Sequence, residues 1–155
     1  MKPLNISHFK PNLKEQKTFR ILVLEDSDFF NKMLTRQLEH YTTILGMEKN
    51  CKFEIVSYTS ATDCLRNLKN DTDIAFVDYY LGDGINGADV VQEIKERCWD
   101  CKIIVMSQVK NLKTTSISLA EGAIDFIFKD SNALPKSCFI LEDIVNSSLS
   151  HHELN

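Results

Sequence analysis

The chain has 155 residues, of which 43% are hydrophobic and 26% charged, and these values indicate one compact globular domain. A net charge of -4 and a pI near 5.5 argue against the basic face that nucleic-acid or membrane-surface binding requires. No apolar run reaches the ~18 residues of a membrane span and the N-terminus lacks a signal-peptide core, so we expect a cytoplasmic protein without membrane or direct nucleic-acid partners.

Three segments are expected along the chain. Residues 1–19 hold two prolines and four lysines with little periodicity, which indicates a flexible N-terminal arm. Residues 20–149 form the folded domain, and residues 150–155 form a C-terminal tail.

Apolar runs predict strands at residues 21–24, 53–58, 74–77, 102–106 and 125–128. Amphipathic patterns predict helices from 27 to 38 with a possible extension through 41–50, and at 61–68, 87–98, 111–121 and 131–148.

The alternation of these elements predicts the fold class. Continuous, β-branched-rich strands followed by amphipathic helices imply a parallel sheet with helices on both faces, which is a doubly wound α/β domain. In such a domain the ligand site lies at the carboxyl ends of the strands.

Polar side chains follow the apolar runs at this edge of the predicted sheet. Glu25 and Asp26 follow the first run, and Asp78 closes the third. Ser107 follows the fourth run, and Lys129 follows the fifth. Three carboxylates, a hydroxyl and an amine are therefore expected to meet at one rim.

This set of groups indicates metal-assisted phosphoryl transfer. Three crowded acids raise one another's pKa unless a cation lies among them. Mg²⁺ suits such a site, because it binds a few carboxylates together with waters and phosphate oxygens. A lysine and a serine add a positive charge and a hydroxyl donor for the phosphoryl oxygens. Asp78 is then the expected nucleophile.

The same ordered set resembles the receiver domain of two-component response regulators, the CheY-like family, over residues 20–149. The resemblance implies a five-stranded, flavodoxin-like parallel sheet in the order 2-1-3-4-5. It also implies a single-domain response regulator in which Asp78 accepts phosphate from a histidine kinase or phosphotransfer protein. Such a domain catalyses only its own phosphorylation and dephosphorylation.

The resemblance assigns metal ligands residue by residue. Asp26, Asp78 and the main-chain carbonyl of Tyr80 match the positions that bind Mg²⁺ in the family. Glu25 matches the acid that acts through a metal-bound water. The implied cofactor is therefore Mg²⁺.

The resemblance also assigns the groups that respond to phosphorylation. Lys129 is expected to pair with the phosphoryl group, and Ser107 to hydrogen-bond to it on activation. Phe126 matches the aromatic switch position that follows the hydroxyl residue's movement. The signal is expected to leave through a surface around residues 111–145, by contact with a downstream protein target.

One departure from the family lies at residue 130. The family usually has a proline after the lysine, joined by a cis peptide bond, whereas this chain has Asp130. Because a non-proline cis bond costs ~2.5 to 4 kcal/mol, we expect either a trans Lys129–Asp130 bond with an altered loop or a strained bond.

Two alternatives come from other functional classes. A haloacid-dehalogenase-type phosphatase also uses a strand-end aspartate, but it needs a second acid two residues later, where this chain has Tyr80. A receiver-shaped binding module that acts without phosphorylation is the second alternative, and the missing proline keeps it open.

The cysteines are expected to be free thiols. Their number is odd and their spacing irregular, which does not suit a disulfide framework. The pair in the segment CWDC, Cys98 and Cys101, closes a predicted helix and has no second pair to complete a zinc site, so packing and turn roles are favoured.

Overall fold

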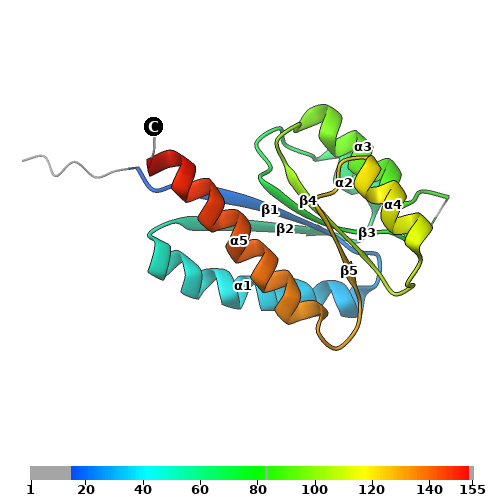
Figure 1. The fold of residues 1–155 in the computed structure, drawn as a ribbon, viewed down its shortest axis with the longest axis horizontal. Coiled ribbons are helices and arrows are strands. Elements are labelled where there is room, and N and C mark those ends of the chain that lie inside the picture. Colours follow the sequence, from blue (N-terminus) through cyan, green and yellow to red (C-terminus); the bar gives the residue numbers. More distant parts are fainter. Residues whose placement is uncertain (1–14, 83, 154–155) are drawn as a thin grey trace, which may run out of the picture.

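The fold alternates strands and helices along the whole described chain (Figure 1). The computed structural model describes residues 15–82 and 84–153. The strands are β1 (Thr18–Leu24), β2 (Lys52–Tyr58), β3 (Ile74–Asp78), β4 (Lys102–Ser107) and β5 (Asp125–Phe128). The helices are α1 (Asp28–Lys49), α2 (Ala61–Arg66), α3 (Gly87–Arg97), α4 (Leu112–Ala120) and α5 (Ala133–Glu153). Each predicted strand and helix is therefore present, in the predicted order.

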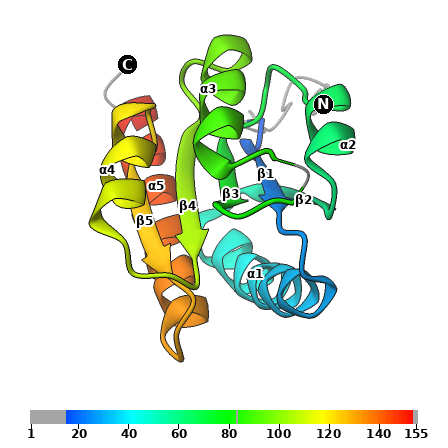
Figure 2. The same cartoon turned by 90° about the vertical axis from the view of Figure 1, so that its right-hand side faces the viewer.

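The five strands form one parallel sheet in the order β2-β1-β3-β4-β5. Helices α1 and α5 cover one face, and α2, α3 and α4 cover the other (Figures 1 and 2). This architecture confirms the doubly wound α/β fold and its strand order. It also places the carboxyl ends of β1, β3, β4 and β5 along one edge.

Strand β3 lies at the centre of the core and is buried along its entire length. Ala75 and Val77 face the cluster beneath α2 and α3, whereas Ile74 and Phe76 face the cluster beneath α1 and α5. A strand with both faces covered has no solvent-facing positions, which explains its uninterrupted apolar sequence. Asp78, at its end, is only 3% exposed.

Helix α1 is longer than its apolar pattern alone indicates. It continues through residues 41–49, which confirms the expected extension. The helix ends where Asn50 adopts the left-handed conformation, with φ 53°, a conformation that asparagine tolerates better than most residues.

Other element boundaries differ from the sequence expectation by a few residues. Strand β1 begins at Thr18, inside the segment expected to be an arm, because its first two residues pair with β2. Residues 1–14 of that arm lie outside the described part of the chain. Helix α2 ends at Arg66, two residues early, and α5 continues to Glu153, inside the expected tail. None of the described helices combines the length and apolar character needed to cross a lipid bilayer.

The described cysteines are all buried and unbonded, as expected for free thiols. Burial raises the pKa of the Cys64 and Cys101 thiols to about 12, which keeps both protonated at neutral pH. The CWDC segment is thus part of the packed interior.

Candidate functional site

Three carboxylates meet at the carboxyl ends of β1 and β3. Each of Glu25, Asp26 and Asp78 offers an oxygen atom within 4.8 Å of the other two. The parallel pairing of Leu24 with Val77 explains this, since the residues that follow this pair on the two strands lie side by side. Glu25 is fully buried, Asp78 nearly so, and Asp26 is exposed.

Lys129 brings a positive charge to this acid cluster from the end of β5. Its Nζ lies 2.6 Å from Glu25 Oε2 and 2.9 Å from Asp78 Oδ1, and its side chain is only 5% exposed. Its backbone N–H donates to the carbonyl of Ser107, which fixes the lysine beside β4. Glu25 Oε2 accepts no hydrogen bond of normal geometry, so the ion pair with Lys129 is what compensates its burial.

The electrostatics of the site leave an excess of negative charge. When all groups are ionised, three carboxylates face one ammonium. Burial, together with Asp26 and Glu25, raises the pKa of Asp78 to about 7 against the opposing effect of Lys129. A hard divalent cation among these oxygens would offset the excess charge, so the donor set fits Mg²⁺.

The other sequence-predicted site residues lie at the same edge in different settings. Ser107 is fully buried at the end of β4, and its Oγ accepts a hydrogen bond from Val109 N at 3.1 Å rather than contacting the acid cluster. Tyr80 is 46% exposed, and its backbone bridges to Asn86. Phe126 is buried, with its ring against Phe128 at 5.5 Å between centroids.

Two residues at the start of α1 support the site but were not predicted from the sequence to do so. The Phe30 ring lies under the Lys129 ammonium, with 4.9 Å between Nζ and the ring centroid. The buried Asn31 amide donates to the carbonyls of Glu25 and Tyr58, both at 3.0 Å, and so ties α1 to the ends of β1 and β2. The only sign of Asn31 in the sequence was that a polar residue stands at a position of α1 that faces the core.

Gly87 allows α3 to approach the end of β3 closely. Its N–H donates to the carbonyl of Tyr79 at 2.6 Å. A Cβ at this position would lie 2.7 Å from the Asp78 carbonyl oxygen, closer than real Cβ contacts occur. Asn86 caps the helix with a reciprocal hydrogen-bond pair to Asp89, which fixes where α3 begins.

The loop after Lys129 differs from the usual family pattern. Of the two expected alternatives, the structure has the trans peptide bond with an altered loop. The Lys129–Asp130 peptide bond is trans, since the described residues contain no cis bond. Asp130 Oδ1 accepts from Asn132 N at 2.9 Å, and its carbonyl accepts from Ala133 N. Asp130 therefore organises the turn into α5 in place of a proline.

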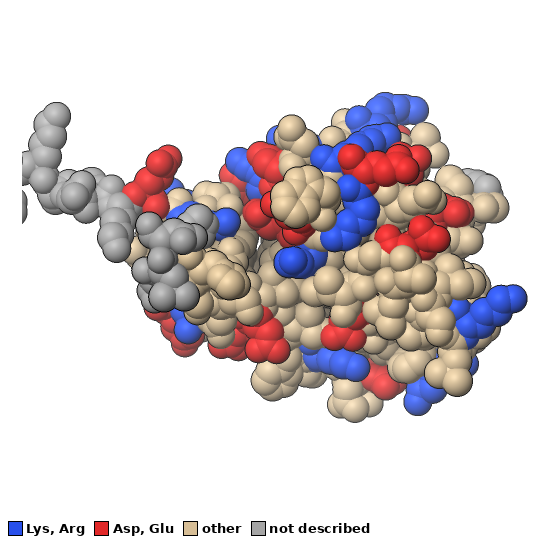
Figure 3. All heavy atoms as spheres, turned by 45° about the horizontal axis from the view of Figure 1, so that its top comes forward, with Lys and Arg blue, Asp and Glu red and all other residues tan. Residues whose placement is uncertain are grey.

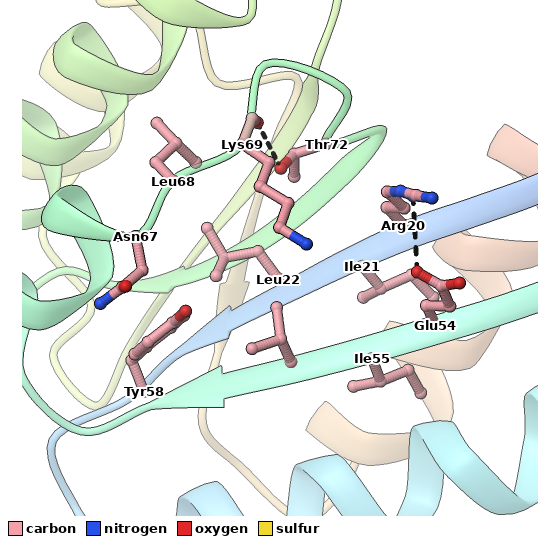
Figure 4. Close-up of a pocket in the computed structure, with 11 residues that line it drawn as sticks. Arg20, Ile21, Leu22, Glu54, Ile55, Tyr58, Asn67, Leu68, Lys69 and Thr72 are labelled. Carbon is pink, nitrogen blue, oxygen red and sulfur yellow. Dashed lines mark hydrogen bonds and ion pairs between the residues drawn. The ribbon is translucent and has the colours of Figure 1, made fainter.

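A separate groove lies along β1 and β2, away from the acid cluster (Figure 4). Its volume is about 340 Å³, and Leu22, Leu68 and Tyr58 line its apolar part. Arg20 pairs there with Glu54 at 3.4 Å. Among the described residues, the groove holds no cluster of acids like that at the strand ends, so the candidate site is defined by its side chains and not by this groove.

Comparison with known proteins is decisive for the family. The model of the response regulator receiver domain family matches residues 21–135. The chain belongs to this family. The predicted membership of the receiver-domain family of two-component signalling is thus confirmed.

Individual relatives of this receiver domain are distant. A 59-residue stretch is 39% identical to the photosynthetic apparatus regulatory protein RegA of Cereibacter sphaeroides, and it covers 38% of this chain and 32% of RegA. The chain thus matches about a third of RegA's length.

Solved receiver structures share the fold at low sequence identity. The BeF3-activated DrrB receiver domain superposes with a TM-score of 0.69 at 16% identity, over 83% of this chain and 98% of DrrB. A Burkholderia pseudomallei response regulator with a phosphorylated aspartic acid, a calcium ion and citrate superposes with a TM-score of 0.60 at 18% identity, over 85% and 74% of the chains.

Proposed function

We propose that this receiver domain accepts a phosphoryl group on Asp78 in a Mg²⁺-dependent reaction and signals by binding a downstream protein. The observation that carries the proposal is the contact of Lys129 Nζ with Asp78 Oδ1 at 2.9 Å, beside two further acids. This arrangement supplies a nucleophile, a cation for the phosphoryl oxygens and a donor set for the metal. The phosphorylated aspartic acid of the Burkholderia pseudomallei relative supports the same chemistry by analogy.

The metal would be held by Asp26, Asp78 and the main-chain carbonyl of Tyr80, with Glu25 acting through a water ligand. When bound, Mg²⁺ neutralises charge on the phosphoryl oxygens during transfer. The carboxylates of the acid cluster fit this role, because together they carry more negative charge than Lys129 balances.

The transfer step uses the chain's own groups as follows. An Asp78 carboxylate oxygen attacks phosphorus of a phosphohistidine in line, forming an O–P bond while the P–N bond breaks and its electron pair returns to the imidazole. Lys129 stabilises the charge on the equatorial oxygens. The product is an acyl phosphate, and its added charge draws the Ser107 hydroxyl away from Val109 and shifts Phe126 with it.

The surface of α4 supports an output by protein contact. Thr114 and Ser118 point inward, where their hydroxyls bond to main-chain carbonyls of the same helix. The apolar side chains point outward instead, with Leu112 86% and Leu119 44% exposed. Because soluble proteins rarely expose contiguous apolar surface without a use, this face of α4 suits a protein partner.

Charge on the molecular surface agrees with a protein partner. On the face shown in Figure 3, basic and acidic side chains of the described residues are interspersed, and neither sign forms a continuous field. We propose a cytoplasmic protein whose partners are a histidine kinase or phosphotransfer protein and a downstream protein target.

Incubation with acetyl phosphate and Mg²⁺, followed by intact-mass measurement, tests the proposal. We expect an adduct of one phosphoryl group in the wild type and none in Asp78→Asn. Asp73→Asn, at the opposite end of β3, is the matched control and should retain the adduct. Absence of any adduct in the wild type would contradict the proposal and favour a receiver that binds its partner without phosphorylation.

A further inference from the structure

Phe30 makes a contact with Lys129 that no part of the proposed function assigns. The residue lies in the first turn of α1, where Ser27 Oγ accepts a hydrogen bond from Phe30 N at 3.4 Å. Its ring is half-buried, packs against the core cluster beneath α1 and lies 4.9 Å from Lys129 Nζ. The ammonium thus contacts two carboxylates and one aromatic ring.

The position of the ring is fixed by its neighbours. Asn31, the next residue, bonds to the carbonyls of Glu25 and Tyr58 and so anchors the first turn of α1 against the sheet. The ring therefore has a defined place relative to the acid cluster. A lysine side chain, in contrast, has a flexible stem and a strongly hydrated head, so its location depends on its contacts.

The aromatic contact differs from the two ion pairs in one respect. Glu25 and Asp78 are proposed to change their interactions when metal and phosphate arrive, whereas the Phe30 ring takes no part in that chemistry. An ammonium over an aromatic face is attracted by the ring quadrupole, more strongly when water is excluded. The Lys129 side chain is only 5% exposed, so this condition is met.

We propose that Phe30 is a positioning residue, whose ring holds the Lys129 ammonium at the acid cluster and shields it from water. The ammonium is then in place before the phosphoryl group arrives, which lowers the ordering cost of binding it. The effect on phosphoryl binding rests on the proposed function, whereas the placement and shielding of Lys129 do not.

The first measurement follows the lysine itself, with ¹⁵N-lysine-labelled protein in EDTA. The protons of a solvent-exposed ammonium exchange too fast to be observed by NMR at neutral pH, whereas those of a shielded one are observable. We expect one such signal in the wild type, assigned by its loss in Lys129→Met. It should be lost in Phe30→Leu and kept in Phe30→Tyr, and in Phe29→Leu, which changes a neighbour that is 74% exposed.

The second measurement is the affinity for beryllofluoride, a phosphoryl analogue, in the presence of Mg²⁺. A cation–π contribution of about 2 kcal/mol, the value for a desolvated pair, corresponds to affinity about 30-fold weaker in Phe30→Leu. Phe30→Tyr and Phe29→Leu should bind as the wild type does. Phe30→Met, which keeps the volume but has no aromatic face, replaces Phe30→Leu if circular dichroism shows that the latter does not fold.

The outcomes separate this inference from the proposed function. A retained Lys129 signal in Phe30→Leu or Phe30→Met, or its loss in Phe30→Tyr, would overturn the positioning role. An absent Lys129 signal in the wild type would overturn it as well. If the wild type does not bind beryllofluoride, the proposed function fails, and the NMR result alone decides whether Phe30 positions the lysine.

Discussion

The Lys129 ammonium and the Asp78 carboxylate form an ion pair at 2.9 Å, although the two residues are 51 positions apart in the chain. The sheet produces this contact, because β4 lies between β3 and β5 and pairs in parallel with both. Since Asp78 closes β3 and Lys129 directly follows β5 at the same edge, the pair depends on the topology of the sheet. Its loss should therefore affect stability as well as chemistry.

Replacing Lys129 should destabilise the fold. Lys129→Met leaves the buried Glu25 and Asp78 carboxylates without their cation, and breaking a buried pair in this way costs about 3 kcal/mol or more. Urea unfolding in EDTA measures the change, with Lys113→Met, an exposed lysine on α4, as the control. An equal free energy of unfolding for the wild type and Lys129→Met would show that the ion pair does not compensate the buried acids.

Replacing Asp78 should have the opposite effect on stability, in a pH-dependent manner. Its pKa is raised from the ordinary 3.8 to about 7 by burial and the neighbouring acids, so folding favours the protonated form. Without metal, the wild type should therefore lose stability as the pH rises from about 4 to about 7. Asp78→Asn has no charge to titrate at this position, so this part of the pH dependence of stability should be absent in the variant.

The comparison of the two proteins isolates this one group. In EDTA, Asp78→Asn should be more stable than the wild type at pH 8 by on the order of a few kcal/mol, and the difference should shrink toward pH 4. Thermal unfolding across this range gives the measurement. A difference that stays constant or widens as the pH falls would mean that the Asp78 pKa is not raised.

Magnesium should stabilise the protein through the acid cluster. A ligand that binds only the folded state adds about 2.7 kcal/mol when its concentration is 100 times its Kd. Titration with MgCl₂ should raise the Tm of the wild type and leave that of Asp26→Asn unchanged. Asp28→Asn, two residues further on in the exposed first turn of α1, should respond as the wild type does. Equal Mg²⁺ responses in Asp26→Asn and Asp28→Asn would place the binding site elsewhere.

Asn31 should contribute to stability through its two hydrogen bonds. Asn31→Ala leaves the Glu25 carbonyl without this donor, whereas the Tyr58 carbonyl keeps the hydrogen bond from Glu25 N, and an unsatisfied buried acceptor costs about 1 to 3 kcal/mol. Denaturant unfolding should show this loss for Asn31→Ala and almost none for Lys32→Ala, an exposed neighbour. Similar free energies of unfolding for the two variants would show that Asn31 does not stabilise the contact between α1 and the strand ends.

The sequence was sufficient to predict the fold and the charged part of the site. Apolar runs and helical periodicity identify the elements, and the parallel-sheet rule then brings strand-end residues such as Glu25, Asp78 and Lys129 to one edge. These residues could be predicted because their positions depend only on strand order, which the family resemblance supplied.

The surrounding contacts could not be predicted in the same way. The placement of Phe30 under Lys129 depends on the rotation of α1 about its axis and its distance from β5, which periodicity does not specify. The outward apolar face of α4 reverses the usual pattern, since Thr114 and Ser118 satisfy their hydroxyls within the helix and can be buried at low cost. Leu112 lies on this outward face and is 86% exposed.

The most direct test of the account is to locate the phosphoryl group after reaction with acetyl phosphate and Mg²⁺. Borohydride reduces an acyl phosphate of aspartate to homoserine, and peptide mass spectrometry identifies the residue that has changed. We predict homoserine at position 78 and unmodified acids at positions 25 and 26. Modification of Asp26 or Glu25 instead, or of no acid at all, would contradict the assignment of Asp78 as the nucleophile.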